Sequence, residues 1–87
     1  MISCNQYDYI EIVCLYRYPI KLTLKNNQTI EGIALDTARN QYKQECIKLN
    51  QQQGNLEGAI PTLVILDEIS SMQVCIDNPH FTYIEFD

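Results

Sequence analysis

Two acidic residues and a tyrosine near the start of this 87-residue chain have types and spacing suited to binding another macromolecule. Asp8 and Glu11 are three residues apart, so a helix places both carboxylates on one edge, with Tyr7 at the margin of that edge. Carboxylates at fixed spacing accept charge-assisted hydrogen bonds from arginine and lysine, and a tyrosine can stack and donate its hydroxyl. We therefore predict that this edge binds a positively charged surface.

The helix that carries these residues is predicted to span about residues 3–16. Ser3 and Gln6 have the spacing of a capping box, in which each residue accepts a hydrogen bond from the backbone of the other. Asn5 with Asp8 offers an alternative cap, so two starting points remain open. In either case Asp8 lies in the first helical turns, where a carboxylate favours the positive end of the helix dipole.

Most of the circumference of this helix is apolar, which leaves a narrow arc for water. Successive residues are about 100° apart around a helix, and this spacing defines one buried stripe. The stripe is predicted to contain Ile10, Val13 and Cys14. Asp8, Glu11 and Leu15 share the remaining arc. Leu15 is expected to pack beneath the barrel, and the alternative is an apolar contact beside the acids. An ordinary solvated helix face is the alternative interpretation of the two carboxylates.

The rest of the chain has the alternation of short strands. Pro19 is expected to stop the helix, and the hydrophobic period then changes from 3.6 to two. Gly32 lies inside one predicted strand and indicates a corner in a strongly coiled sheet. The strands are expected at residues 20–25, 28–38, 42–49, 63–66, 69–76 and 82–86. Five to six short antiparallel strands after one helix predict a mostly β fold, with a small barrel over about residues 19–87 of a single domain, 1–87.

The distribution of charge favours a basic protein over a nucleic acid as the direct partner. The net charge is −5, and all six lysines and arginines precede Leu49. Residues 49–87 contain six acidic residues and no lysine or arginine. Such a surface repels phosphate backbones over long range and attracts basic surfaces.

The sequence contains no recognisable pattern for metal binding or catalysis. Its four cysteines do not form a Cys-x-x-Cys pair, and His80 is the single histidine. A zinc site usually has closely spaced ligand pairs, so we expect reduced thiols and no metal or cofactor. There is also no carboxylate–histidine pair, glycine-rich phosphate loop or Cys–His spacing typical of an enzyme. Without an export signal or a run of about 18 apolar residues, a cytoplasmic protein with no membrane association is expected.

Several segments resemble the bacterial Rho-binding antiterminators, known as the Rof family. They are CNQYDYIEIVC at residues 4–14, LTL at 22–24, EGIALDT at 31–37 and, more weakly, LDEI at 66–69. The resemblance implies an Sm-like barrel with an N-terminal helix and no catalytic activity. It also implies binding to the transcription termination factor Rho, on the RNA-binding surface of its N-terminal OB-type domain, so that Rho cannot engage transcripts.

In that family the interacting face is acidic and centred on the N-terminal helix. Matched position by position, this face corresponds here to Tyr7, Asp8 and Glu11, with Asn5 and Gln6 beside them. Relatives often carry acids directly after the first cysteine of the segment, where this chain has the two neutral amides. An inhibitor that docks on a hexamer can act as a monomer, and a monomer is expected.

The alternative function is an Sm-like RNA-binding module. The strand around Gly32, Leu35 and Asp36 has a weak likeness to the first Sm motif. A phosphate path is conceivable along Lys21, Lys25, Arg39, Lys43 and Lys48. The net charge argues against this function, as does the lack of aromatic residues interleaved with basic ones on these strands. Asp36 is instead interpreted as a structural turn carboxylate.

Overall fold

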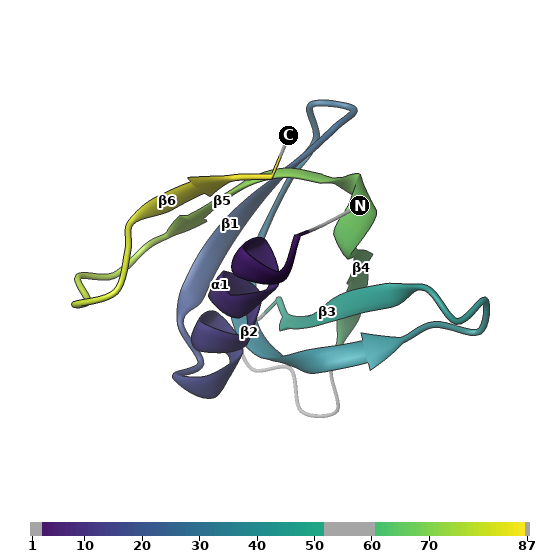
Figure 1. Cartoon of the computed structure of the whole chain (residues 1–87), viewed down its shortest axis with the longest axis horizontal. Coiled ribbons are helices and arrows are strands. Elements are labelled where there is room, and N and C mark those ends of the chain that lie inside the picture. The colour runs from purple at the N-terminus through teal and green to yellow at the C-terminus, as the bar shows by residue number, and fades with distance from the viewer. Residues whose placement is uncertain (1–2, 52–60, 87) are drawn as a thin grey trace.

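The computed structural model describes residues 3–51 and 61–86, which form one helix followed by six strands (Figure 1). The elements are α1 (Cys4–Leu15), β1 (Pro19–Leu24), β2 (Thr29–Arg39), β3 (Glu45–Asn50), β4 (Thr62–Ile65), the 3-10 turn η1 (Leu66–Glu68), β5 (Ile69–Val74) and β6 (Tyr83–Glu85). Neighbouring strands are antiparallel, in the order β4-β3-β2-β1-β5-β6. The mostly β fold with one N-terminal helix is therefore confirmed. The sheet does not close into the predicted barrel, because no pairing joins β4 to β6 within the described residues.

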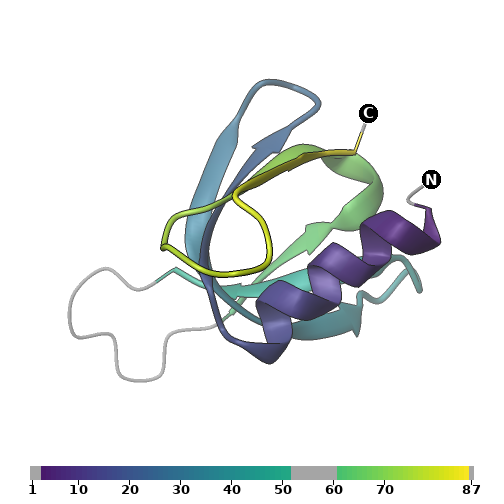
Figure 2. The ribbon, with the colours of Figure 1, turned by 60° about the vertical axis from the view of Figure 1, so that its left-hand side comes forward.

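Strand β2 connects the two halves of the sheet and bends between them (Figure 2). Its first part, residues 29–33, pairs with β1, and its second part, residues 33–39, pairs with β3. Gly32 lies at this change of partner, where a Cβ atom would be 3.0 Å from the backbone oxygen of Asn50. A glycine allows the two backbones to approach this closely. The predicted corner at Gly32 thus has a specific cause.

The start of α1 is the predicted capping box. The backbone amide of Gln6 donates to Ser3 Oγ at 3.2 Å, and the backbone amide of Ser3 donates to Gln6 Oε1 at 2.9 Å. These bonds satisfy amides that have no partner within the helix. The alternative cap at Asn5 is not used, because Asn5 already lies within the helix.

The end of α1 differs from the prediction that Pro19 stops the helix. The amides of Arg17 and Tyr18 donate to the carbonyls of Cys14 and Val13 at 3.3 and 3.0 Å, which is the Schellman pattern of a helix C-terminus. Arg17 has a φ of 53°, in the left-handed region that usually holds glycine. The chain has thus left the helix before Pro19, which begins β1.

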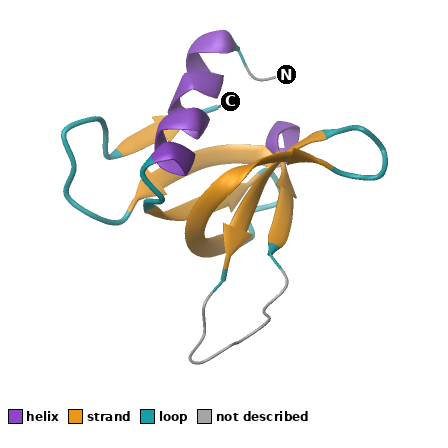
Figure 3. Cartoon of the chain, turned by 90° about the horizontal axis from the view of Figure 1, so that it is seen from below, coloured by secondary structure: helices purple, strands orange, loops and turns teal. Residues whose placement is uncertain are grey.

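The helix lies across one face of the curved sheet and is held there from two sides (Figures 1 and 3). Its predicted apolar stripe, Ile10, Val13 and Cys14, is buried in the core of the domain. On one side α1 packs along β2. On the other, the β5–β6 loop contributes Phe81, whose ring meets the ring of Tyr9 edge-on at 4.7 Å. Burial of an aliphatic side chain contributes roughly 1.5–3 kcal/mol, so this packing fixes the position of the helix.

Gln6 also ties α1 to the last strand. Its Nε2 atom donates to the backbone oxygens of Glu85 and Phe86 at 3.3 and 3.4 Å. The same side chain therefore closes the capping box and joins the two ends of the described chain.

We predict that Gln6→Ala lowers the free energy of unfolding by about 1–2 kcal/mol, because it removes the reciprocal cap and the tether to Glu85 together. Urea denaturation followed by far-ultraviolet circular dichroism measures this change. Gln41→Ala is the matched control, because Gln41 is exposed in the β2–β3 turn. Equal stability of the two variants would show that the Gln6 bonds contribute little.

Candidate functional site

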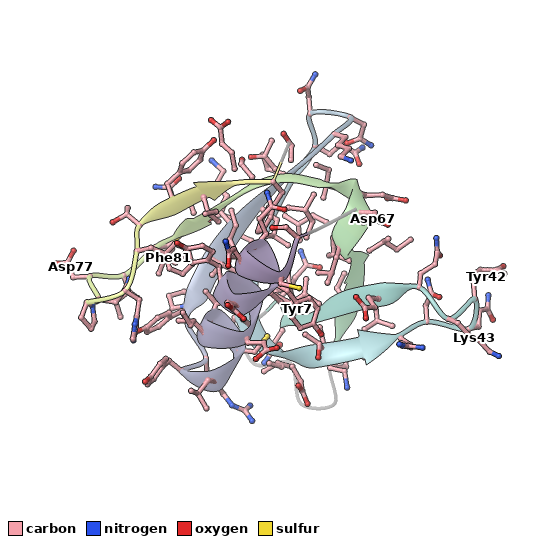
Figure 4. All side chains as sticks on the ribbon, in the orientation of Figure 1. Tyr7, Tyr42, Lys43, Asp67, Asp77 and Phe81 are labelled. Carbon is pink, nitrogen blue, oxygen red and sulfur yellow. The ribbon has the colours of Figure 1, made fainter. Side chains whose placement is uncertain are left out.

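The solvent-facing edge of α1 presents most of the residues proposed from the sequence. Asp8, Glu11 and Asn5 are exposed, and Leu15 is 73% exposed, so it does not pack beneath the sheet. Tyr7 is half-buried and packs against the core (Figure 4).

A groove of about 720 Å³ runs between this edge and strand β2. Its lining combines acidic side chains with apolar ones and one arginine: Asp8, Glu11, Ile12, Cys14, Leu15, Arg17, Leu35, Asp36 and Thr37. The helix supplies one wall and the strand supplies the other. The helix-only surface expected from the sequence is therefore one side of a two-sided site.

Asp36 and Arg17 are the charged residues lining this groove that the sequence argument did not select. Asp36 is exposed, and its Oδ1 accepts a hydrogen bond from the amide of Thr37 at 2.8 Å; it lies within strand β2, so the expected turn at this position is wrong. A shift in strand register between Ala34 and Asp36 interrupts the pairing of β2 with β3 at this point. Asp36 lines the groove opposite the helix, so three carboxylates border one groove.

The helix carboxylates are not neutralised by ion pairs with the described residues. Within residues 3–51 and 61–86, neither Asp8 nor Glu11 has a lysine or arginine nitrogen within 4.0 Å. Arg39 instead pairs with Glu45 at 3.8 Å, on the β2–β3 hairpin. Of the residues that the structure describes, Arg17 is the one basic residue that lines the groove. The acidic edge thus remains available to an external cation.

Cys14 lies beneath the groove, and the charged side chains around the groove alter its pKa. The pKa of its thiol is raised from 9.0 to about 11, mainly by burial; Asp36 and Glu11 contribute to the rise, and Arg17 opposes it. Charged side chains from both walls of the groove therefore influence the pKa of the Cys14 thiol. With its pKa raised, this thiol is mostly protonated at neutral pH.

Gln6 was expected beside the interacting residues, and the structure engages its side chain elsewhere. Both polar ends of this side chain bond to the protein's own backbone, at Ser3, Glu85 and Phe86. Gln6 is half-buried, whereas Asn5 beside it is exposed. Gln6 therefore helps to orient the acidic edge.

Two further features bear on the kind of site this is. Among the residues that the structure describes, no group of three or more histidine, cysteine, aspartate or glutamate side chains could hold a metal ion. The same residues include no helix long and apolar enough to cross a membrane. The described part of the chain is thus a small domain in which a short capped helix lies on an antiparallel sheet, with a groove bordered by carboxylates between them.

The chain belongs to the ROF family of modulators of Rho-dependent transcription termination, whose family model matches residues 1–86. It is similar to a solved structure of YaeO bound to magnesium, from Vibrio cholerae O395. The two chains are 43% identical, with a TM-score of 0.80 over 94% of this chain and 99% of that one. A comparison with curated proteins gives no match. The family resemblance inferred from the helix and strand motifs is confirmed, and so is the fold.

We predict that two of the four thiols react readily with an alkylating reagent and that the other two are protected by burial. Cys4 and Cys75 are exposed, whereas Cys14 and Cys46 are buried. At pH 8 the raised pKa of Cys14 lowers its thiolate fraction about a hundredfold relative to an ordinary thiol. Pulsed alkylation with iodoacetamide, read by peptide mass spectrometry, should modify the exposed pair first. Labelling of Cys14 as fast as Cys4 would contradict the placement of Cys14 beneath the groove.

Proposed function

We propose that this protein inhibits Rho-dependent termination by docking the groove between α1 and β2 on the RNA-binding surface of Rho's N-terminal domain. Its membership of the ROF family supports Rho as the partner. The observation that carries the docking mode is the exposure of Asp8 and Glu11 on a fixed helix edge, without ion pairs to described residues. In this proposal the protein occupies the surface of Rho to which a transcript would otherwise bind.

The physical basis is competition between carboxylates and phosphates for the same cations. A surface that binds RNA carries lysine and arginine side chains at the spacing of the backbone phosphates. Asp8 and Glu11 offer negative oxygens at a fixed separation, and one charge-assisted hydrogen bond to an arginine contributes on the order of 1.5–3 kcal/mol. Asp36 adds a third carboxylate from the opposite wall. Ile12 and Leu15 supply apolar contact for the aliphatic parts of the entering side chains.

A rigid helix makes this competition effective. The capping box fixes the start of α1, the Schellman bonds fix its end, and the Tyr9–Phe81 contact holds its flank. Preorganised groups lose little conformational entropy on binding, so more of the electrostatic attraction appears as affinity. Tyr7 is similarly restrained by its packing against the core. Asn5 lies exposed beside it and completes the proposed contact.

The remaining parts of the proposal follow from this contact. The protein acts in the cytoplasm as a monomer, without a cofactor or metal and without catalysis. It does not itself bind nucleic acid, since its acidic surface repels phosphates. The Sm-like RNA-binding alternative predicts the opposite behaviour, namely a shift of single-stranded RNA in a gel when Rho is absent. Such a shift would replace the proposed mechanism by direct RNA binding.

We predict that Asp8→Asn combined with Glu11→Gln weakens binding to purified Rho roughly 30-fold or more, because two charge-assisted bonds become neutral ones. Biolayer interferometry with Rho immobilised measures the affinity, and wild-type binding should weaken as salt rises. Glu31→Gln with Asp77→Asn is the control, because it changes the net charge equally at exposed positions outside the groove. Asp77 lies in the β5–β6 loop, well away from β2 (Figure 4). Equal effects of the two double variants would mean that only overall charge matters.

Asp36→Asn tests the second wall of the groove. The asparagine oxygen can still accept the hydrogen bond from Thr37, so this local bond within β2 is kept while the charge is lost. We expect a threefold to tenfold loss of affinity for Rho, with an unchanged melting temperature. Unchanged affinity would confine the contact to the helix.

A further inference from the structure

Arg17 combines an unusual backbone conformation with a position in the acidic groove. Its φ of 53° lies in the left-handed region, at the helix C-terminal position where glycine or asparagine is usual. A residue with a Cβ atom is strained in this conformation. Strain of this kind, when the surroundings maintain it, is a reason to look for a role of the side chain.

The surroundings hold this turn firmly. The Schellman bonds fix the amides of Arg17 and Tyr18. The residues on both sides of Arg17 stack their rings, with the centroids of Tyr16 and Tyr18 5.5 Å apart. The ring of His80 from the β5–β6 loop stacks on Tyr16 at 4.9 Å. The position of Arg17 at the end of the groove is therefore set by several independent contacts.

The charge of Arg17 opposes the three carboxylates of the groove. All four side chains line the same space. Their effects on the pKa of Cys14 have opposite signs, since Asp36 and Glu11 raise this pKa and Arg17 lowers it. The positive charge therefore reaches the same region as the negative charges. It reduces the negative potential that an approaching cation meets.

We propose that Arg17 competes with the cationic side chains of the partner for the negative potential of the groove. This internal competition keeps the affinity of the groove for the partner below its maximum. This inference rests on the proposed function and deepens it. A partner arginine or lysine that enters between α1 and β2 meets repulsion from the guanidinium of Arg17, whose charge also weakens the negative potential of the carboxylates. Removal of the Arg17 charge makes this potential more negative, so binding becomes tighter.

The test compares neutral and charged replacements of Arg17. Arg17→Asn removes the charge with a residue that tolerates the left-handed conformation, and Arg17→Gly removes both the charge and the strain. Both variants are expected to bind purified Rho threefold to tenfold more tightly, with a steeper loss of affinity as salt rises. Arg17→Lys keeps the charge and is expected to lack this gain. Lys21→Gln is the control for net charge, because Lys21 lies on β1 and does not line the groove.

A purely structural role of Arg17 gives a different result. In that case Arg17→Gly raises the melting temperature while the affinity of both neutral variants stays at the wild-type value or falls, and the inference is overturned. Equal gains from Lys21→Gln and Arg17→Asn would also overturn it, because net charge alone would then explain the effect.

The inference can be separated from the proposed function with a hexa-arginine peptide as the probe. If the wild-type protein fails to bind Rho, the proposed function is wrong, but the titration of the peptide followed by amide chemical shifts still tests Arg17. Tighter binding of the peptide by Arg17→Asn, with shifts at Asp8, Glu11 and Asp36, supports internal competition. Equal binding by the wild-type protein and this variant refutes it.

Discussion

The burial of one side of α1 against the sheet is the interaction on which the other features of the protein depend. Ile10 and Val13 are fully buried, and this commits the opposite edge of a short helix to solvent. Asp8 and Glu11 occupy that edge, so their exposure is a geometric consequence of the core. The same packing places the helix beside β2 and thereby creates the groove. A change in the core would therefore alter the acidic surface without touching a charged residue.

Much of this arrangement could be predicted because it depends on local patterns. The capping box at Ser3 and the alternation of residues from Pro19 onward are short-range signals, and most of the predicted boundaries lie within three residues of those observed. The role of Asp36 depends on a shift in pairing between β2 and β3, which involves strands distant in sequence. The helix ends close to the predicted residue 16, but the sequence assigned this end to Pro19, because an arginine in a left-handed conformation has no local signature. The open sheet likewise depends on long-range pairing that periodicity does not reveal.

The groove is acidic because its carboxylates do not form ion pairs with basic side chains of the described residues. The one ion pair of the hairpin, Arg39 with Glu45, leaves the groove carboxylates unaffected. Arg17 remains in the groove as a single opposing charge. The chain belongs to a family of modulators of Rho-dependent termination, and in our proposal this groove is the surface that recognises Rho. The raised pKa of Cys14 fits the same view, because an inert thiol serves the core.

The bond from Gln6 to the carbonyl of Glu85 has a consequence for the border of the sheet. Thr82 and Phe86 direct their backbone groups toward β5, so Glu85 between them directs its own groups away from it. An outward backbone oxygen at the margin of a sheet invites an additional strand from another molecule. Here that acceptor is already occupied by the protein's own helix. The side-chain amide of Gln6 therefore protects this part of the edge strand β6. A strand from another molecule would have to displace the Gln6 side chain before it could pair with the carbonyl of Glu85.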